Sequence, residues 1–307
     1  MNDPSTAKTT LRVLVLWDNE ALLAPTISFV RGVAGEESRL MLLPVACGPA
    51  EGGGETTPKT LEGDATEILE RIGQVSDSVE EIIAIADARA ADLIVMATTC
   101  CAVGALDHSC GAAELALDSP IPVLLLRTHD LEHAAVSPIR RVLVPLDGSA
   151  RAAQALPLAS GMARRLDIPV QFIMVIDPAR VLPPAYAYDP EARDNIITDL
   201  RETAHWTLKQ AERQLEHEGV VVSSSLLYGP VSTCIRAAIE PHDLLVMTTH
   251  GTGRAAASRL GSVAAQMVEH VTTPLVIGRV QPQGDVVVDA ACPWIEPVSS
   301  SSPFSGT

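Results

Sequence analysis

The chain contains an internal repeat, and this repeat limits the folds open to it more than any other feature. Three segments of the first half recur in the same order in the second half: 13–18 (VLVLWD) with 142–147 (VLVPLD), 92–96 (DLIVM) with 243–247 (DLLVM), and 119–127 (SPIPVLLLR) with 271–279 (VTTPLVIGR). The separations are 129, 151 and about 152 residues. A repeat of this length holds several strands and helices, so the chain is predicted to be two copies of one structural unit.

Within each copy, short apolar runs alternate with segments of helical periodicity. Runs such as residues 244–247 are typical of strands buried on both faces, and strands that alternate with helices indicate a parallel sheet. Apolar residues make up 47% of the 307 residues and aromatic residues only 3%, so Val, Leu, Ile and Ala must fill the core. The predicted fold class is therefore α/β, with two tandem, open, Rossmann-like parallel-sheet domains. The predicted organisation is a disordered N-terminus at 1–10, a first domain at 11–128, a linker at 129–138, a second domain at 139–280, and a mostly disordered Ser- and Pro-rich tail at 281–307.

The elements of the second copy are the easier ones to place. Its strands are predicted at 141–146, 170–176, 220–227, 244–247 and 274–278, and its helices at 150–166, at 190–218 ending before Gly219, and from near Pro230. In the first copy, a helix is predicted at 20–33, a strand at 40–46, and a helix at 78–91 that begins with a capping box of Ser78 and Glu81. Glu62-Gly63-Asp64 is aligned with Tyr228-Gly229-Pro230 at the end of strand three, which would leave an extra segment before residue 92.

A loop of small residues follows the strand at 244–247 and precedes a helical segment at 261–271. This order is the one in which α/β proteins build an anion site, because glycines allow close approach and a helix N-terminus carries about half a positive charge. The loop has no lysine for a Walker A motif, and Ala256 stands where a dinucleotide fingerprint needs its third glycine. What remains is Gly251, nine residues, and then Gly261-Ser262.

This spacing resembles the nucleotide loop of the universal stress protein family, G-x2-G-x9-G-[S/T], with Thr248 in place of the first glycine. Together with the repeat, the resemblance covers most of residues 11–280 and is to the tandem form of the family. It implies two domains of the adenine-nucleotide α-hydrolase type and a stress-response regulator that binds ATP, or AMP or ADP, with Mg accompanying the phosphates.

The nucleotide contacts implied by the resemblance lie in the second domain. They are Pro145, Leu146 and Asp147 after strand one, Val175 at the end of strand two, and Met247, Thr248, Gly251, Gly261, Ser262 and Val263 around the loop. Asp147 would contact the adenine and ribose end, Gly251 and Gly261 would supply close backbone N–H groups, and Ser262 a phosphate hydrogen bond. The Cβ of Thr248 is expected to narrow the site. Helix capping alone would also explain Asp147 and Ser262.

The corresponding loop of the first copy has lost these features. Cys100 and Cys110 replace its glycines, and Gly111 replaces the hydroxyl residue at the helix start. Although Asp18 remains, we predict that the first domain is degenerate and packs rather than binds. Cys100, Cys101, His108 and Cys110 leave a zinc site or a redox-sensing thiol open as alternatives to plain replacement by small residues.

Net charge and composition limit the classes of partner that this protein is expected to bind. The net charge of −16 disfavours nucleic acid and an anionic membrane surface, and no apolar run reaches membrane-spanning length. The N-terminal residues lack the apolar region of a signal peptide, and six irregularly placed cysteines are typical of a reduced compartment, so a cytoplasmic location is expected.

No catalytic residue, acid–base pair or acidic metal cluster stands out, so at most slow ATP hydrolysis is predicted. The two lobes are expected to pack as a pseudo-dimer and to dimerise again through their last strands. Two alternatives stay open: a structural or partner-binding protein that binds no nucleotide, and an ATPase or flavoprotein relative, although the pyrophosphatase-type S-G-G-x-D-S loop is absent after strand one.

Overall fold

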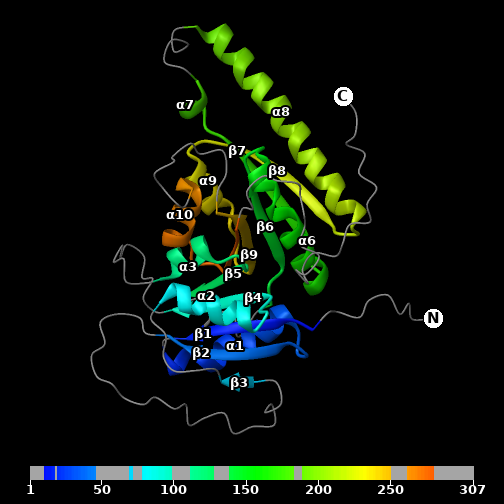
Figure 1. The fold of residues 1–307 in the computed structure, drawn as a ribbon. Helices are drawn as coiled ribbons and strands as arrows, with labels where there is room; N and C mark the ends of the chain where they lie inside the picture. Colours follow the sequence, from blue (N-terminus) through cyan, green and yellow to red (C-terminus); the bar gives the residue numbers. More distant parts are fainter. Residues whose placement is uncertain are drawn as a thin grey trace, which may run out of the picture.

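The computed structural model describes residues 10–17, 19–45, 69–71, 78–98, 111–127, 138–182, 189–249 and 261–279. Within them a single sheet of ten strands runs through the whole molecule in the order β3-β2-β1-β4-β5-β10-β9-β6-β7-β8 (Figure 1). The first five strands in this order come from the first half of the chain and the last five from the second half. The two predicted copies are therefore two lobes of one continuous sheet.

Both lobes have the same topology. The first lobe consists of β1 (Arg12–Trp17), α1 (Glu20–Ala34), β2 (Arg39–Pro44), β3 (Leu69–Arg71), α2 (Val79–Ala88), β4 (Leu93–Thr98), α3 (Ala112–Asp118) and β5 (Val123–Arg127). The second consists of β6 (Arg141–Leu146), α5 (Ala150–Ala153), α6 (Ala155–Leu166), β7 (Val170–Ile176), α7 (Pro178–Val181), α8 (Pro190–His217), β8 (Val222–Tyr228), α9 (Val231–Ala238), β9 (Asp243–Thr248), α10 (Ser262–His270) and β10 (Leu275–Gly278). Pairing is parallel throughout each lobe, which confirms the predicted fold class.

Helices cover both faces of the sheet, and two apolar cores result. One core packs α1, α5, α6 and α8 on one face, with Phe172 among its fully buried side chains. The other packs α2, α3, α9 and α10 on the opposite face. Successive strand residues alternate between the two cores, as side chains of a pleated strand must. None of the helices in the described ranges is both long and apolar enough to cross a membrane.

The lobes join through their last strands. β5 and β10 pair antiparallel, with Leu125 opposite Leu275. Two arginines reinforce this joint: Arg127, at the end of β5, donates to the carbonyl of Val268 in α10, and Arg279, after β10, donates to the carbonyl of Asp118 in α3 at 2.9 Å. Each lobe thus binds the carboxyl end of the other lobe's last helix, where backbone carbonyls carry partial negative charge.

This joint corrects the expectation that the lobes dimerise again through their last strands. Both edges of β5 are occupied, by β4 and β10, and both edges of β10 by β9 and β5. The last strands have no free edge for a second copy, because each has already paired with its counterpart in the same chain.

The third strand of the first lobe also differs from expectation. Glu62-Gly63-Asp64 lies outside the described residues, but the strand itself is β3 at Leu69–Arg71, so it does not end at residue 64. α2 then connects β3 to β4 just as α9 connects β8 to β9, and it is the crossover helix rather than an extra segment. Its N-cap is Ser78, whose hydroxyl accepts from the Glu81 amide at 3.5 Å, as the capping prediction requires.

The segment predicted as one helix at 150–166 is divided at Gln154 into α5 and α6. Pro157 lies one turn after Ala153 and has no N–H with which to bond the Ala153 carbonyl, which accounts for the break. α7 was not predicted, and the remaining helices and strands of the second lobe lie within two residues of their predicted positions.

An ion pair is repeated at the amino edge of both lobes. In the second lobe Arg141, the first residue of β6, makes two bonds to the carboxylate of Asp243, the first residue of β9, at 2.8 and 2.5 Å. In the first lobe Arg12 and Asp92 occupy the same places, with a single contact of 3.5 Å between their side chains. The hydrogen bond to Asp243 raises the pKa of Arg141 above its ordinary value, although burial opposes this.

Candidate functional site

The candidate site lies at the carboxyl edge of β6 and β9, which are neighbours in the sheet and run parallel. β6 leads into the helices of one face through residues 147–149, and β9 leads to α10 on the other face. The connections after these two strands therefore diverge to opposite faces, and a crevice is expected between them. Ligands of open α/β sheets bind at such a switch point.

Asp147 organises the turn after β6. Its carboxylate accepts from the Ser149 amide at 3.0 Å and from the Ser149 hydroxyl at 2.6 Å. Ser149 in turn accepts from the Ala152 amide at 3.0 Å and is the N-cap of α5, while Gly148 between them has φ of +80°. Asp147 is therefore not a helix cap, which corrects one of the two explanations offered for it. Its side chain is exposed at the edge of the crevice.

Thr248 ends β9 and is buried at 6% exposure. Its hydroxyl donates to the carbonyl of Arg151 in α5 at 3.2 Å. The side chain points toward the α5 face of the sheet, so it connects the end of β9 to α5, the helix that follows the turn of Asp147. Sequence reasoning missed this role because the partner is a backbone carbonyl 97 positions away.

Thr248→Val is expected to lower the free energy of unfolding by about 1 kcal/mol, because it removes this hydrogen bond and leaves the Arg151 carbonyl without that donor. Thr248→Ser keeps the hydroxyl and is the matched control. Urea unfolding curves of both variants would check this, and equal stability of Thr248→Val and wild type would contradict it.

The ends of the loop at 250–260 are held together. The Thr249 amide donates to the carbonyl of Gly278 in β10 at 3.1 Å, and the Gly261 amide donates to the carbonyl of Thr249 at 2.9 Å. The Gly261 N–H, which the resemblance assigns to a nucleotide, therefore has an acceptor within the chain in this structure. Gly251 lies outside the described residues.

α10 begins directly at this point. Gly261 is its N-cap, there is no side-chain cap hydrogen bond, and Ser262 is the first helical residue and is exposed. Helix capping therefore does not explain the presence of a serine at position 262. The first intrahelical bond runs from Ala265 to the Gly261 carbonyl, so helix geometry leaves the amides of residues 262–264 without acceptors inside the helix.

The apolar residues of the predicted site divide between the two faces. Met247, Val175 and Val263 belong to or pack against the core beneath α9 and α10, while Leu146 belongs to the core beneath α5 and α6. Pro145 is half-buried near the end of β6. The structure thus places Met247, Val175 and Val263 on the α10 side of the sheet, and Leu146 and Thr248 on the α5 side.

In the first lobe, Asp18, Cys100, Cys101, His108 and Cys110 lie outside the described residues. Gly111 is the N-cap of α3, which has no side-chain cap hydrogen bond. Both last helices are therefore capped by glycine, so loss of a capping hydroxyl does not distinguish the first lobe from the second, contrary to expectation. No cluster of three or more His, Cys, Asp or Glu side chains suited to a metal occurs among the residues that the structure describes.

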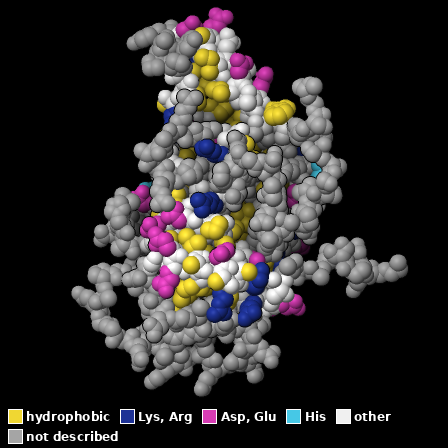
Figure 2. All heavy atoms as spheres, in the orientation of Figure 1, with side chains coloured by type: hydrophobic (Ala, Val, Ile, Leu, Met, Phe, Trp, Pro, Cys, Tyr) yellow, Lys and Arg dark blue, Asp and Glu magenta, His cyan; other side chains and the backbone are white. Residues whose placement is uncertain are grey.

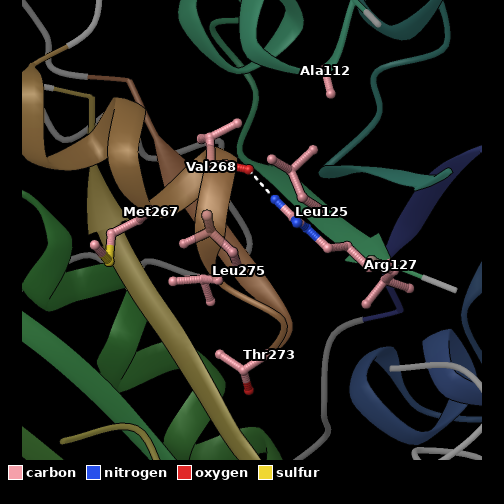
Figure 3. A pocket seen from close by; sticks show the side chains of 9 residues that line it. Ala112, Leu125, Arg127, Met267, Val268, Thr273 and Leu275 are labelled. Atoms are coloured by element: carbon pink, nitrogen blue, oxygen red, sulfur yellow. Dashed lines mark hydrogen bonds between the residues drawn. The ribbon is translucent and has the colours of Figure 1, made fainter. Parts of the chain in front are cut away.

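A shallow hollow lies apart from this crevice, at the joint between the lobes (Figure 3). It is lined mainly by aliphatic side chains of β5, α10 and β10, and the side chain of Arg127 crosses it to reach the Val268 carbonyl. Because an arginine already spans it, the hollow is part of the lobe joint and not a second ligand site.

Fold and site together define a two-lobed α/β protein with a switch point between β6 and β9. The universal stress protein family model matches residues 138–279. A universal stress protein of Methanocaldococcus jannaschii is 27% identical over 141 residues, which is 45% of this chain and 81% of that protein.

Solved structures extend the likeness to both lobes. A universal stress protein from Archaeoglobus fulgidus has 17% identity and a TM-score of 0.60, and the alignment covers 88% of this chain and 96% of that one. A protein of unknown function from Pseudomonas aeruginosa has 14% identity, a TM-score of 0.60, and coverage of 89% and 94%. At these identities the structures show the tandem fold alone. The likeness in sequence is thus to the universal stress protein family, as the resemblance predicted, and the solved structures show the shared fold of both lobes.

Proposed function

We propose that the second lobe binds ATP or a related adenine nucleotide and that the protein is a nucleotide-responsive regulator of a stress response. The observation that carries this proposal is the pairing of two features at one switch point: the exposed Asp147 carboxylate after β6, and the first turn of α10 after β9. A carboxylate accepts from ribose hydroxyls, and a helix N-terminus with unused amides attracts phosphate.

The expected arrangement follows from this edge of the sheet. Asp147 would accept from the ribose, and the apolar side chains of Val175, Met247 and Val263 would lie toward the adenine. The phosphates would lie against the first turn of α10, where Ser262 offers both its hydroxyl and its amide, and Gly251 would supply a backbone N–H as the resemblance implies. Mg would be held by the phosphates, because the described residues contain no acidic cluster of their own to hold it. The proposal includes at most slow hydrolysis.

The first test is to identify and count the bound nucleotide. Protein purified without added nucleotide would be denatured, the released compounds separated by chromatography, and ATP titrated into stripped protein by calorimetry. We expect one adenine nucleotide per chain, because the proposal assigns binding to the second lobe alone. Two nucleotides per chain would contradict the prediction that the first lobe is degenerate.

Asp147→Asn is expected to weaken ATP binding about tenfold, because the nucleotide loses one hydrogen bond to an ionised acceptor. The substitution keeps an Oδ1 acceptor for the Ser149 amide and hydroxyl, so the turn before α5 can stay intact. Asp18→Asn, at the matching position of the first lobe, is the control and should bind ATP as wild type does. Equal weakening by both variants would contradict the assignment to the second lobe.

If no nucleotide is released and no titration heat is seen, the alternative of a structural or partner-binding protein replaces this proposal. A yellow protein would instead indicate a flavin.

We place the protein in the cytoplasm on the irregular spacing of its six cysteines; in the described part of the chain, Cys234 is a free thiol.

A further inference from the structure

α8 stands out from the rest of the molecule by its length and position. It has 28 residues and packs with its carboxyl-terminal half on β7 and β8, at one end of the sheet (Figure 1). All of its buried residues fall between positions 204 and 215. The amino-terminal half extends past the sheet, and hydrophobic and acidic side chains stand together on this projecting end (Figure 2).

The side of α8 that faces away from the sheet carries Trp206, which is 66% exposed. Side chains three, four and seven residues on either side of a helical position lie on the same face, within about 60° of it. For Trp206 this outward stripe consists of six further residues, and every one is exposed: Asp199, Glu202, Thr203, Lys209, Gln210 and Arg213.

Charge is sorted along the outward stripe. The acidic residues, Asp199 and Glu202, lie before Trp206, and the basic residues, Lys209 and Arg213, lie after it. Suppose that a second copy of α8 packs antiparallel on the first, with Trp206 of both copies at the two-fold axis. A residue that lies a given number of positions before Trp206 in one copy then faces the residue the same number of positions after Trp206 in the other copy. Asp199 of one copy then faces Arg213 of the other, and this pair forms twice. Lys209 already bonds Glu212 of its own helix, so the argument rests on Asp199 and Arg213.

We propose that a second copy of this chain docks on α8 and forms an antiparallel, two-fold dimer centred on Trp206. The charge pattern selects this occupant, because a stripe that is acidic at one end and basic at the other complements itself only when the partner helix is the same one reversed. The outward face lies opposite the side packed on β7 and β8, so two copies can approach along it. The last strands are not available for this contact, because each is paired on both edges.

Trp206 supplies the apolar centre of the contact. Burying two indole rings against each other at the axis removes a large exposed apolar surface, and aromatic residues at interface centres carry much of the binding energy. One helix pair makes a small interface, so the dimer is expected to be concentration-dependent rather than permanent.

The test is sedimentation velocity of the full chain over a concentration series, with circular dichroism to verify folding. Wild type should shift toward twice its 32.4 kDa mass as concentration rises. Trp206→Ala should raise the dissociation constant at least about tenfold. Arg213→Asp alone and Asp199→Arg alone should each remain monomeric, because each places like charges opposite each other.

Mixing the two charge variants provides the decisive comparison. In the mixed dimer, both positions of one copy are acidic and both positions of the other are basic, so the two attractive pairs are restored and dimer should reappear. A dimer that forms only on mixing cannot be explained by a loss of stability in either variant. Arg236→Asp, an exposed change on α9 at the opposite face of the sheet, is the control and should dimerise as wild type does.

A wild-type chain that stays monomeric over the series would overturn the proposal. A dimer that persists undiminished in Trp206→Ala would also overturn it, since the contact would then lie elsewhere.

Discussion

Asp243→Ala is expected to lower the free energy of unfolding by about 3–5 kcal/mol, the largest effect of a single substitution that we anticipate on stability. Asp243 is 2% exposed, accepts two bonds from Arg141, and also accepts from the Glu240 amide at 2.8 Å. Its removal leaves a guanidinium that is 18% exposed with Glu240 at 3.5 Å, Gln171 and the Ala238 carbonyl as its remaining partners. Urea unfolding followed by far-UV circular dichroism would measure the change.

The first lobe provides the matched comparison, because Arg12 and Asp92 repeat the pair. Arg12 is 45% exposed and makes one long contact, so water can replace the lost carboxylate there. Asp92→Ala is expected to cost about 1–2 kcal/mol, mostly for the hydrogen bond from the Arg12 amide at 2.8 Å. A second comparison is Arg141→Met/Asp243→Leu, which removes both charges and should recover part of the loss.

If Asp243→Ala were no less stable than Asp92→Ala, the burial argument for the second pair would be wrong. Nucleotide affinity should be unchanged in both variants when they are folded, because both pairs lie at the amino edge of the sheet, opposite the Asp147 turn.

The strands with apolar runs could be predicted from the sequence to within one or two residues, and the reason is physical. Strands such as β6 and β9 are buried on both faces, so nearly every position must be apolar, and the flanking turns mark their ends. β3 lacks this signal: it is the three-residue edge strand Leu69–Arg71, with Glu70 in its middle. An edge strand of three residues need not be an apolar run, which explains why it was misplaced.

The joint between the lobes could not be placed from the sequence either. The last strands of both copies are apolar whether they pair with each other or with another molecule, so the pattern alone cannot choose between an intramolecular and an intermolecular joint. What decides it in the structure is the antiparallel pairing of β5 with β10, together with the two arginine bonds to Val268 and Asp118. Those bonds link residues 141 and 161 positions apart and leave no local signature.

At the candidate site, the sequence predicted contacts after β6 and β9, which are neighbours in the sheet, but it did not predict the hydrogen bonds there. Asp147 and Ser262 were chosen for plausible contacts that capping could equally explain, and the structure assigns N-cap positions to Ser149 and Gly261 instead. A shift of the helix start by one residue decides whether a residue is the N-cap or the first residue of the helix. Helix ends are uncertain by one or two residues when judged from sequence.

The register at α10 makes a second large effect testable. Ser262→Pro is expected to weaken ATP binding about a hundredfold, because it removes both the hydroxyl and the amide that the proposed phosphate site uses. Proline is accepted at the first position of a helix, where the amide has no intrahelical acceptor. Gly261 before it has φ of −59° and ψ of 144°, the extended conformation that a residue before proline adopts. The helix should therefore survive the substitution.

Ser262→Ala separates the two contributions. It removes only the hydroxyl and keeps the amide, so ATP binding should weaken about tenfold. Adenosine, which has no phosphate, should bind Ser262→Pro, Ser262→Ala and wild type with equal affinity, because its contacts lie at the Asp147 end. Calorimetric titration of each variant with both ligands would measure these values. If adenosine binding fell as much as ATP binding, the loss would come from a distorted loop, and the assignment of phosphate to the α10 terminus would be wrong.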